Sequence, residues 1–358
     1  MIRRSLGTAL LLAAAIAFFT DTGAVRAEEN PPGPYKVEKT VHVGGEGGWD
    51  YLTFDPQTRQ LYLTRTTHTI VVDPTNGKIV ADIPGGTRNH GTALVPEAGR
   101  GFITDGKDAG AGSVTVFDLK TNEVLGKLKA PVDADGIIYD PGSGKVLVVS
   151  GDAGVVFAID PNVDPKNGRI ETPVDLGGKP EFLAADGQGK VYINLADKDQ
   201  VAVVDTKAMK VLAHWPTAPG GEPTGMSIDR EHGRLFIGCR KPAKLVVMST
   251  TDGKILGDFP IGPGVDATIF DHGCGLASCA DGTLTVVGDA GSGDHPKLLQ
   301  TLTTAPGART MTVDPATGTV YLETADMQPA GAPTPNGRPA RPKPIPGTFK
   351  LIVVERVH

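Results

Sequence analysis

Short apolar runs, each closed by a turn residue, recur from about residue 35 to the last residue of the chain. A typical unit reads YLTFD, then a turn, then LYLTR. The residues that close the first run of successive units are Asp55, Pro96, Asp140, Asp186, Asp229, Asp271 and Asp314. These seven positions are 41, 44, 46, 43, 42 and 43 residues apart. An even period of this length is the signature of a repeat architecture, in which each unit is one supersecondary structure.

Each unit continues with a third apolar run and usually a fourth. For example, TIVVD is followed by PTNG and KIVADI, and QVAVVD is followed by TKAM and KVLAHW. Four short strands in about 43 residues match one propeller blade. We therefore predict an all-β fold, a seven-bladed β-propeller of four-stranded antiparallel blades, with strands a to d running outward from the centre. Two separate all-β domains are the alternative, but the even period without a linker favours one ring.

The last unit lacks its outer strand, and the missing strand is predicted at the other end of the chain. The seventh unit supplies strand a ending at Asp314 and two further strands at 320–324 and 350–355. Residues 35–43, YKVEKTVHV, read like a fourth strand placed before the first unit. We expect this N-terminal strand to complete the last blade, because closure removes open sheet edges and holds both termini. Residues 35–358 are thus predicted to form a single propeller.

One stretch in the middle of the chain carries a family resemblance. The segment VYINLADKDQVAVVDTKAMKVLAHW, followed by GGEPTGMSID, resembles the bacterial YVTN or YncE-like β-propeller repeat. Residues 192–194, Tyr-Ile-Asn, stand near that family's Tyr-Val-Thr-Asn run. The resemblance covers the chain from about Tyr35 to His358, and the sixth unit, with CGLASCADG, departs from it most. It implies the propeller fold and an exported protein that binds a ligand or partner, and it carries no catalytic motif.

Composition agrees with many short strands and turns. The chain has 47 glycines and 29 prolines among 358 residues, which disfavours a helical protein. Hydrophobic residues make up 39% and charged residues 21%, so a packed core is expected.

The first 27 residues have the pattern of a secretory signal peptide. Arg3 and Arg4 form a basic start, residues 6–19 form an apolar run too short to span a bilayer comfortably, and Ala27 is a small residue at the expected cleavage point. We predict cleavage before Glu28, a linker over residues 28–34, and a periplasmic or secreted protein. An uncleaved membrane anchor is the alternative. No later stretch approaches the 18 apolar residues of a membrane span, so no transmembrane segment is predicted in the mature chain.

Net charge limits the classes of partner that the chain can bind, and the number of cysteines limits the disulfide bonds that it can form. The formal net charge is −6, and without residues 1–27 it becomes −8, from 32 basic and 40 acidic residues. This excess of acidic residues disfavours nucleic acid as a partner.

The chain has three cysteines, Cys239, Cys274 and Cys279, so at least one thiol is unpaired. Whether two of them form a disulfide stays open. We expect a monomer.

The repeat register places several charged residues at one end of the central channel. Five positions before the turn residues, the units carry a ring that includes Asp50, Asp135, Glu181, Asp266 and Arg309, and Trp49 and His90 stand one position earlier. The loops between strands b and c are predicted to add Arg65, His68 and Arg240 to the same face. We predict that ligands bind through these residues.

Four carboxylates at one channel mouth repel each other unless a cation lies among them. Arg309 is one candidate, a cationic ligand is another, and a divalent cation such as Ca²⁺ on Asp50, Asp135, Glu181 and Asp266 is a third. A wide, water-filled funnel needs no cation, because water and salt screen the charges. His68 and His90 lie on adjacent blades and could converge with Asp50 as metal ligands or acid–base groups.

Two functions remain open at this stage. The first is a non-catalytic scaffold that binds a small ligand, a polysaccharide or a periplasmic protein partner through the funnel face. The second is a divalent-metal-dependent hydrolase or lyase at the top of the channel, with His90 as base and Arg309 stabilising developing negative charge. The sequence contains no HExxH and no G-x-S-x-G motif, so it leaves open whether the protein is an enzyme.

A proline-rich insertion interrupts the last blade. Residues 325–347, ADMQPAGAPTPNGRPARPKPIPG, separate two strands of that blade on the funnel side. The segment carries Arg338, Arg341 and Lys343. We predict either a basic flap over the mouth or an insertion without contacts.

Overall fold

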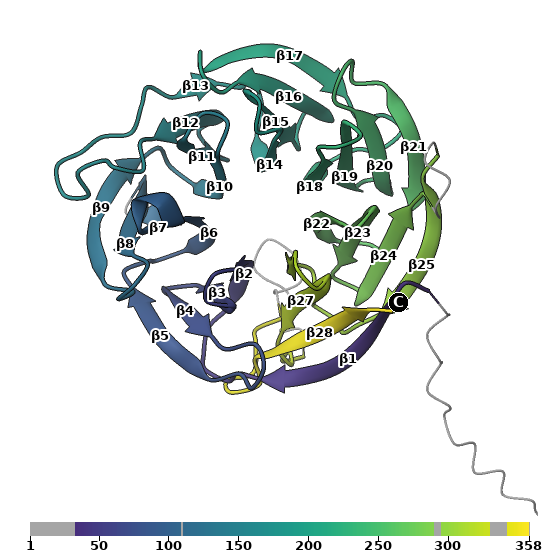
Figure 1. Cartoon of the computed structure of the whole chain (residues 1–358), viewed down its shortest axis with the longest axis horizontal. Helices are drawn as coiled ribbons and strands as arrows, with labels where there is room; N and C mark the ends of the chain where they lie inside the picture. The colour runs from purple at the N-terminus through teal and green to yellow at the C-terminus, as the bar shows by residue number, and fades with distance from the viewer. Residues whose placement is uncertain (1–32, 109, 290–294, 330–341, 358) are drawn as a thin grey trace, which may run out of the picture.

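A closed ring of seven sheets forms the molecule. The structure is a computed structural model, and it describes residues 33–108, 110–289, 295–329 and 342–357. These residues form seven four-stranded antiparallel sheets around a central channel (Figure 1). The described residues contain one further element, the short 3₁₀ helix Pro96–Ala98. The predicted seven-bladed propeller is confirmed.

The strands follow one another from the channel to the rim in each blade. The first three blades comprise β2 (Trp49–Asp55), β3 (Gln60–Arg65), β4 (His68–Val72) and β5 (Ile79–Pro84); β6 (Asn89–Val95), β7 (Arg100–Asp108), β8 (Ala111–Asp118) and β9 (Val124–Ala130); and β10 (Ala134–Asp140), β11 (Lys145–Ser150), β12 (Val155–Ile159) and β13 (Val174–Asp175). The next three comprise β14 (Pro180–Ala185), β15 (Lys190–Leu195), β16 (Gln200–Asp205) and β17 (Lys210–Pro216); β18 (Pro223–Asp229), β19 (Arg234–Arg240), β20 (Ala243–Ser249) and β21 (Ile255–Pro260); and β22 (Val265–Asp271), β23 (Cys274–Cys279), β24 (Thr283–Gly288) and β25 (Lys297–Thr303). The seventh comprises β26 (Met311–Asp314), β27 (Thr319–Thr324), β28 (Lys350–Arg356) and β1 (Tyr35–His42).

Turn chemistry explains the periodic aspartates of the sequence. The side chains of Asp55, Asp140 and Asp314 each accept a hydrogen bond from the backbone N–H two residues later, at 2.9, 3.0 and 3.0 Å. Asp186 accepts the equivalent bond at 2.7 Å. An aspartate is favoured at such a turn because its short side chain satisfies a backbone donor that the strands leave unpaired. In the second blade Pro96 takes this position and begins the 3₁₀ helix instead.

The core lies between the blades. The inner strands are buried on both faces because each blade packs against two neighbours, as in β11, where the four residues from Val146 to Val149 are all buried. The outermost strands alternate between half-buried and exposed positions, as β17 does. One such inter-blade cluster joins Val114 and Val116 of the second blade to Val146 and Phe157 of the third. All three cysteines are buried free thiols within these sheets.

The first strand closes the ring. In Figure 1 the purple β1 lies beside the yellow β28, and the two strands pair antiparallel from Tyr35 with Arg356 to His42 with Lys350. Gln300 of β25 binds the Tyr35 backbone, its Oε1 accepting from the N–H at 3.0 Å and its Nε2 donating to the carbonyl at 2.8 Å. The predicted closure is therefore confirmed, with the strand ending at His42 rather than at residue 43.

The innermost strand of most blades carries an irregularity at its mouth end. The pairing register shifts between Trp49 and Leu52, between Ala134 and Ile137, and at the matching position of four other blades. Such a bulge re-aims side chains away from the regular up-and-down alternation of a strand. The four predicted ring carboxylates, Asp50, Asp135, Glu181 and Asp266, lie at these bulges, so their side chains can turn toward the channel axis, whereas Arg309 precedes β26.

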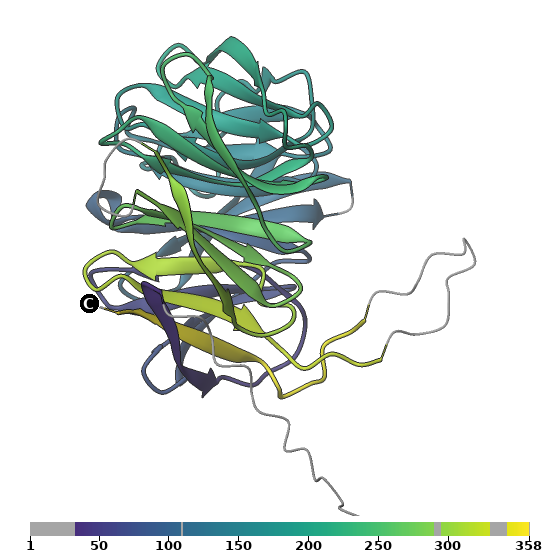
Figure 2. The same ribbon diagram turned by 90° about the vertical axis from the view of Figure 1, so that its right-hand side faces the viewer.

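Three predicted segments fall wholly or partly outside the described residues. The signal peptide, residues 1–27, and most of the linker lie outside them. Of the insertion, residues 325–329 and 342–347 are described, and they project from one face of the ring (Figure 2). Met327 and Pro344 form an antiparallel bridge, and Gln328 N–H donates to the Lys343 carbonyl at 2.8 Å. Among the described residues, we find no helix long and apolar enough to cross a membrane.

Removal of β1 is expected to destabilise the whole ring. A chain that starts at residue 43 leaves the edge of β28 unpaired and removes the buried Tyr35 and Val41 side chains. Burial of two such side chains contributes about 4 kcal/mol to the free energy of unfolding. We expect a large drop in melting temperature together with aggregation, measured by thermal unfolding and light scattering.

The matched control starts at residue 33 and keeps β1. A synthetic peptide of residues 33–43, added to the truncated chain, is expected to restore part of the lost melting temperature. If both truncated chains melt at the same temperature, β1 does not hold the ring together.

Candidate functional site

A polar cavity of about 670 Å³ opens at one end of the channel. It is lined by residues from the channel ends of all seven blades and by the base of the insertion, and we call it the mouth cavity. Its lining residues are Gly48, Trp49, Asp50, Tyr51, Arg88, His90, Asp133, Asp135, Lys179, Glu181, Arg240, Asp266, Arg309, Met327, Pro342 and Pro344. Eight of the ten residues predicted from the sequence are among them: Trp49, Asp50, His90, Asp135, Glu181, Arg240, Asp266 and Arg309.

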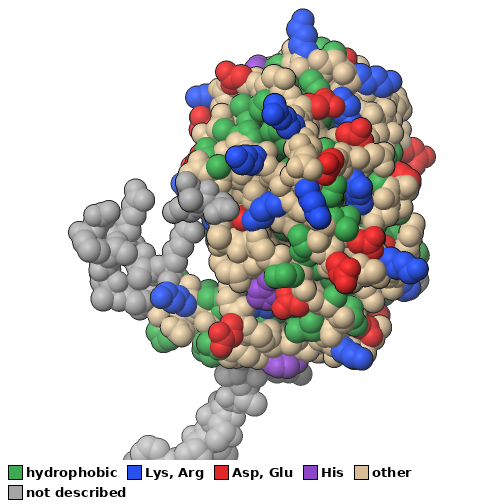
Figure 3. All heavy atoms as spheres, turned by 90° about the vertical axis from the view of Figure 1, so that its left-hand side faces the viewer, with side chains coloured by type: hydrophobic (Ala, Val, Ile, Leu, Met, Phe, Trp, Pro, Cys, Tyr) green, Lys and Arg blue, Asp and Glu red, His purple; other side chains and the backbone are tan. Residues whose placement is uncertain are grey.

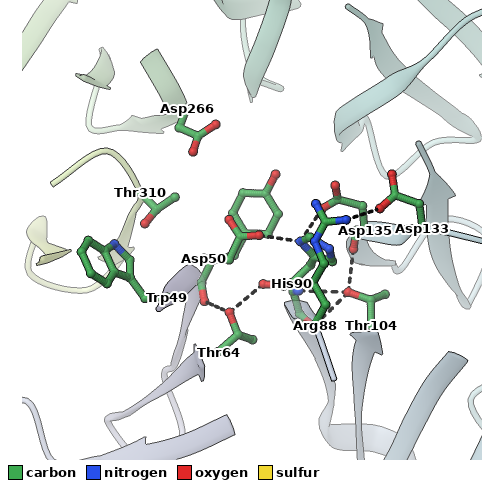
Figure 4. A network of polar contacts seen from close by, with 12 residues as sticks. Trp49, Asp50, Thr64, Arg88, His90, Thr104, Asp133, Asp135, Asp266 and Thr310 are labelled. Atoms are coloured by element: carbon green, nitrogen blue, oxygen red, sulfur yellow. Dashed lines mark hydrogen bonds and ion pairs between the residues drawn. The ribbon is translucent and has the colours of Figure 1, made fainter. Parts of the chain in front are cut away.

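Two threonines of the second strands hold the mouth ends of adjacent blades together (Figure 4). Thr64 Oγ1 lies 2.7 Å from the carbonyl oxygens of both Tyr51 in its own blade and His90 in the next. Thr104 Oγ1 accepts from the Gly91 N–H at 2.9 Å and donates to the Asp135 carbonyl at 2.6 Å. These bonds satisfy backbone groups that the bulges leave unpaired. They fix Asp50, His90 and Asp135 relative to one another, although the three residues come from three blades.

Asp50, His90 and Asp135 converge on one wall, and we call them the histidine cluster. His90 Nδ1 lies 2.5 Å from Asp50 Oδ2 and 3.5 Å from Asp135 Oδ1. The His90 side chain is only 5% exposed. Its ring passes so close to β7 that a Cβ added to Gly106 would lie 2.6 Å from His90 Nε2. Glycine at position 106 therefore makes room for the imidazole.

The two carboxylates change the proton affinity of the cluster. Burial by itself lowers the pKa of His90, but the hydrogen bond to Asp50 and the negative charges of Asp135 and Asp50 outweigh it and raise the pKa to about 9. Burial raises the pKa of Asp135 to about 8, against the opposing charge of His90. Near neutral pH the imidazole is therefore a cation clamped between two acidic groups.

On the other side of the cavity, Arg240, Asp266 and Arg309 form a second group, which we call the arginine cluster. Arg309 Nε donates to Asp266 Oδ2 at 2.6 Å, and Arg240 Nη2 donates to Asp266 Oδ1. Burial raises the pKa of Asp266, and the two arginines oppose that rise. Asp266 is thus bound by two guanidinium groups, and the cation site on all four ring carboxylates stays a prediction. Of the predicted cations, Arg309 does lie at the ring.

The mouth also carries two basic side chains, Arg88 and Lys179, which the sequence analysis did not identify as site residues. Arg88 pairs with Asp133 at 3.1 Å, and Lys179 pairs with Asp152 at 3.2 Å. Arg88 and Lys179 stand two positions before His90 and Glu181 in the sequence. Both lie directly before the innermost strand of their blade, β6 or β14, so a search of the residues that lead into each innermost strand would have identified both.

The cavity has an aromatic floor. The rings of Tyr51 and Phe182 meet edge to face, with centroids 4.6 Å apart. Below them lies a smaller cavity of about 180 Å³, lined by Tyr51 and Phe182 together with apolar residues that include Ile269 and Met311. The charged mouth thus ends at this aromatic pair, and the channel below it is largely apolar.

Two predicted site residues do not reach the mouth cavity. Arg65 is 2% exposed and turns back into the loop 44–48, where it donates to the carbonyl oxygens of Glu46 and Gly47 at 2.7 and 2.9 Å. Its guanidinium also stacks 3.9 Å from the Phe349 ring centroid. His68 lies at the start of β4, beside Thr67, and does not join His90 and Asp50. Asp135 takes the third place in that group instead.

The fold and this site define a seven-bladed β-propeller with a charged cavity at one channel mouth. Two proteins of Escherichia coli, from strains O157:H7 and K12, both called uncharacterized protein YncE, are each 28% identical to the chain over 160 residues. These matches cover 40% of this chain and 44% of each relative, so the chain spans less than half the length of these relatives. No protein-family model matches the chain.

A solved structure supports the fold alone. The crystal structure of the RRP9 WD40 repeats superposes with a TM-score of 0.70 at 10% identity, covering 90% of this chain and 99% of that one. The chain is therefore a propeller with a loose similarity to YncE, and its function has to be argued from its own residues.

Loss of the His90 charge is expected to weaken the fold at alkaline pH. The pKa of His90 in the folded chain, about 9, exceeds the ordinary value of 6.5. Its stabilising contribution is therefore fully present below pH 6.5 and is lost as the pH rises through 9. We therefore compare the free energy of unfolding of the natural chain with that of a His90→Gln variant. The difference between the two chains should be about 3 kcal/mol larger at pH 6 than at pH 10.

Urea unfolding of both chains between pH 6 and pH 10 measures this difference. An NMR titration of the natural chain, with the His90 signals assigned from the variant, gives the pKa directly. A His90 imidazole that titrates near 6.5 would show that the clamp by Asp50 and Asp135 does not form.

Proposed function

We propose that the protein is an exported YncE-like propeller that binds a small anionic ligand in the mouth cavity. Export rests on the signal-peptide pattern of residues 1–27, and it places the protein in the periplasm or outside the cell. The loose similarity to YncE and the propeller scaffold support a binding role. The choice of ligand class rests on the cavity itself.

The single observation that carries this proposal is the difference in exposure between the basic and acidic side chains of the cavity. Its four basic side chains, Arg88, Lys179, Arg240 and Arg309, are between 33% and 54% exposed. Asp50, Asp133, Asp135 and Asp266 are between 7% and 22% exposed. Asp133 and Asp266 therefore hold the three arginines in place from behind, and the groups that a ligand meets first are cations.

The shape of the site favours a small ligand over a polysaccharide or a protein partner. A cavity of about 670 Å³ is in the range of small-molecule sites, which enclose most of their ligand's surface. Met327, Pro342 and Pro344, at the base of the insertion, also line the cavity. Arg240 and Arg309 keep guanidinium surface accessible while each binds Asp266, so both can also hold a carboxylate or phosphate oxygen.

Calorimetry and thermal unfolding test this proposal with defined probes. We would titrate the chain with inorganic phosphate, citrate and galacturonate, and with galactose as the uncharged control. We expect at least one anion to bind with a stoichiometry of one and galactose not to bind. Arg309→Gln and Arg240→Gln should each weaken that binding roughly tenfold to hundredfold, because each removes a charge-assisted hydrogen-bond donor.

The matched control makes the same change far from the cavity. Arg169 lines a shallow hollow with Lys127, Lys129 and Lys166 on the outer side of the ring. Figure 3 shows the side of the second and third blades, where basic and acidic side chains are scattered. Arg169→Gln should bind like the natural chain. No binding of any of the three anions, or equal binding by all variants, would contradict the proposal, and binding of polygalacturonate alone would indicate a polysaccharide instead.

A further inference from the structure

We propose that the histidine cluster, Asp50, His90 and Asp135, is a site for one divalent transition-metal ion, of which Mn²⁺ and Zn²⁺ are the best suited. The site differs from the four-carboxylate cation site predicted from the sequence. His90 serves here as a ligand through Nδ1, and Glu181 and Asp266 take no part. The inference is independent of the anionic ligand, because the metal would bind with or without it.

The first argument is geometric. One Nδ1 and two carboxylate oxygens, each from a different residue, all lie within 4.8 Å of one another. Metal–ligand bonds to imidazole nitrogen and carboxylate oxygen are roughly 2.0–2.2 Å long, so two ligands of one ion lie at most about 4.4 Å apart, and small side-chain movements bring all three atoms into that range. In Figure 4 Asp50 and His90 face each other across the cavity wall, with Asp135 beside the imidazole. The threonine bonds to the His90 and Asp135 carbonyls hold this arrangement at the backbone.

The second argument is an unsatisfied oxygen within the cluster. Asp135 Oδ1 is closed to solvent and has no hydrogen-bond partner among the described residues, although it lies 3.5 Å from His90 Nδ1. A buried carboxylate oxygen without a donor costs free energy. His90 Nδ1 can direct its single N–H bond at only one oxygen, and Asp50 Oδ2 is the nearer one. A cation placed between all three atoms would satisfy Asp135 as well.

The ligand types select the kind of metal. Two carboxylates and one imidazole form a mixed oxygen–nitrogen set, which suits Mn²⁺, Fe²⁺, Co²⁺ and Zn²⁺. Ca²⁺ takes oxygen ligands, six to eight of them, and the cluster offers two carboxylates and a nitrogen. The Ca²⁺ considered from the sequence is therefore a poor fit here.

The cluster also leaves part of the metal's coordination sphere open. Asp50 and Asp135 are 22% and 14% exposed, and both line the mouth cavity. Three protein ligands together with an accessible side are the arrangement of metal sites that bind water or a ligand in the remaining positions. A metal here would lie on the wall of the same cavity in which Arg240 and Arg309 are accessible.

Binding of Mn²⁺ and Zn²⁺ to the metal-free full chain tests this inference. Chelated and dialysed protein is titrated with each metal alone, by calorimetry and by the loss of the free Mn²⁺ signal in electron paramagnetic resonance. We expect one ion per chain, and tenfold or more weaker binding in Asp135→Asn. Ca²⁺ at the same concentrations is expected to bind at least tenfold more weakly than Mn²⁺ or Zn²⁺.

Asp258→Asn is the matched control. Asp258 lies on the outer strand β21 and binds Lys244 rather than the cluster, so this variant should keep its metal affinity within about threefold. Pulsed electron paramagnetic resonance of Mn²⁺ on the natural chain reports a directly bound imidazole nitrogen and does not depend on any variant folding. Absence of stoichiometric binding, equal weakening in the two variants, or absence of a nitrogen coupling would overturn the inference.

Discussion

The bulge at the channel end of the innermost strands is the constraint on which the site depends. A regular strand would send successive side chains alternately to its two faces, and both faces of an inner strand are covered by neighbouring blades. The extra residue in each bulge breaks this alternation and turns one side chain toward the channel axis. It also leaves backbone carbonyls unpaired, and Thr64 and Thr104 bind those of the next blade. Backbone contacts between blades therefore set how far apart the Cα atoms of the histidine cluster lie. The distances between its side-chain atoms follow from that spacing.

The charges of the mouth cavity are arranged in depth as well as around the ring. Carboxylates lie at the wall, and most of the guanidinium and ammonium groups stand in front of them. Burial raises the pKa of Asp135, Glu181 and Asp266, which shows how much solvent the acids have lost. Buried acids of this kind are tolerated because each has a cation near it, His90 for Asp135 and two arginines for Asp266. An anionic ligand and a metal ion would meet different parts of this arrangement, the first the arginines and the second the histidine cluster.

The repeat period made the fold predictable from the sequence, because the turn aspartates and strand lengths that create the period also build each blade. The ring positions follow from the same register, which is why it predicts that Asp50, Asp135 and Arg309 lie at the channel mouth, where the structure has them. Arg65 was placed wrongly because a long side chain can turn back from its own strand, and the carbonyl groups of loop 44–48 offer it better partners than the open cavity. The pairing of Asp266 with Arg240 and Arg309 joins three blades, so it depends on the angle between blades, which a linear pattern does not contain.

Closure by β1 has a consequence for how the protein is made. The strand that completes the last blade is among the first parts of the propeller to be synthesised, and its partner β28 lies at the opposite end of the chain. Pairings this distant in sequence form slowly, because a long loop has to close before they stabilise anything. Until then the β28 edge is open to other chains. In a translation product that stops before β28, β1 has no partner and the last blade keeps exposed strand edges. Ring closure therefore distinguishes chains that contain both β1 and β28 from truncated ones.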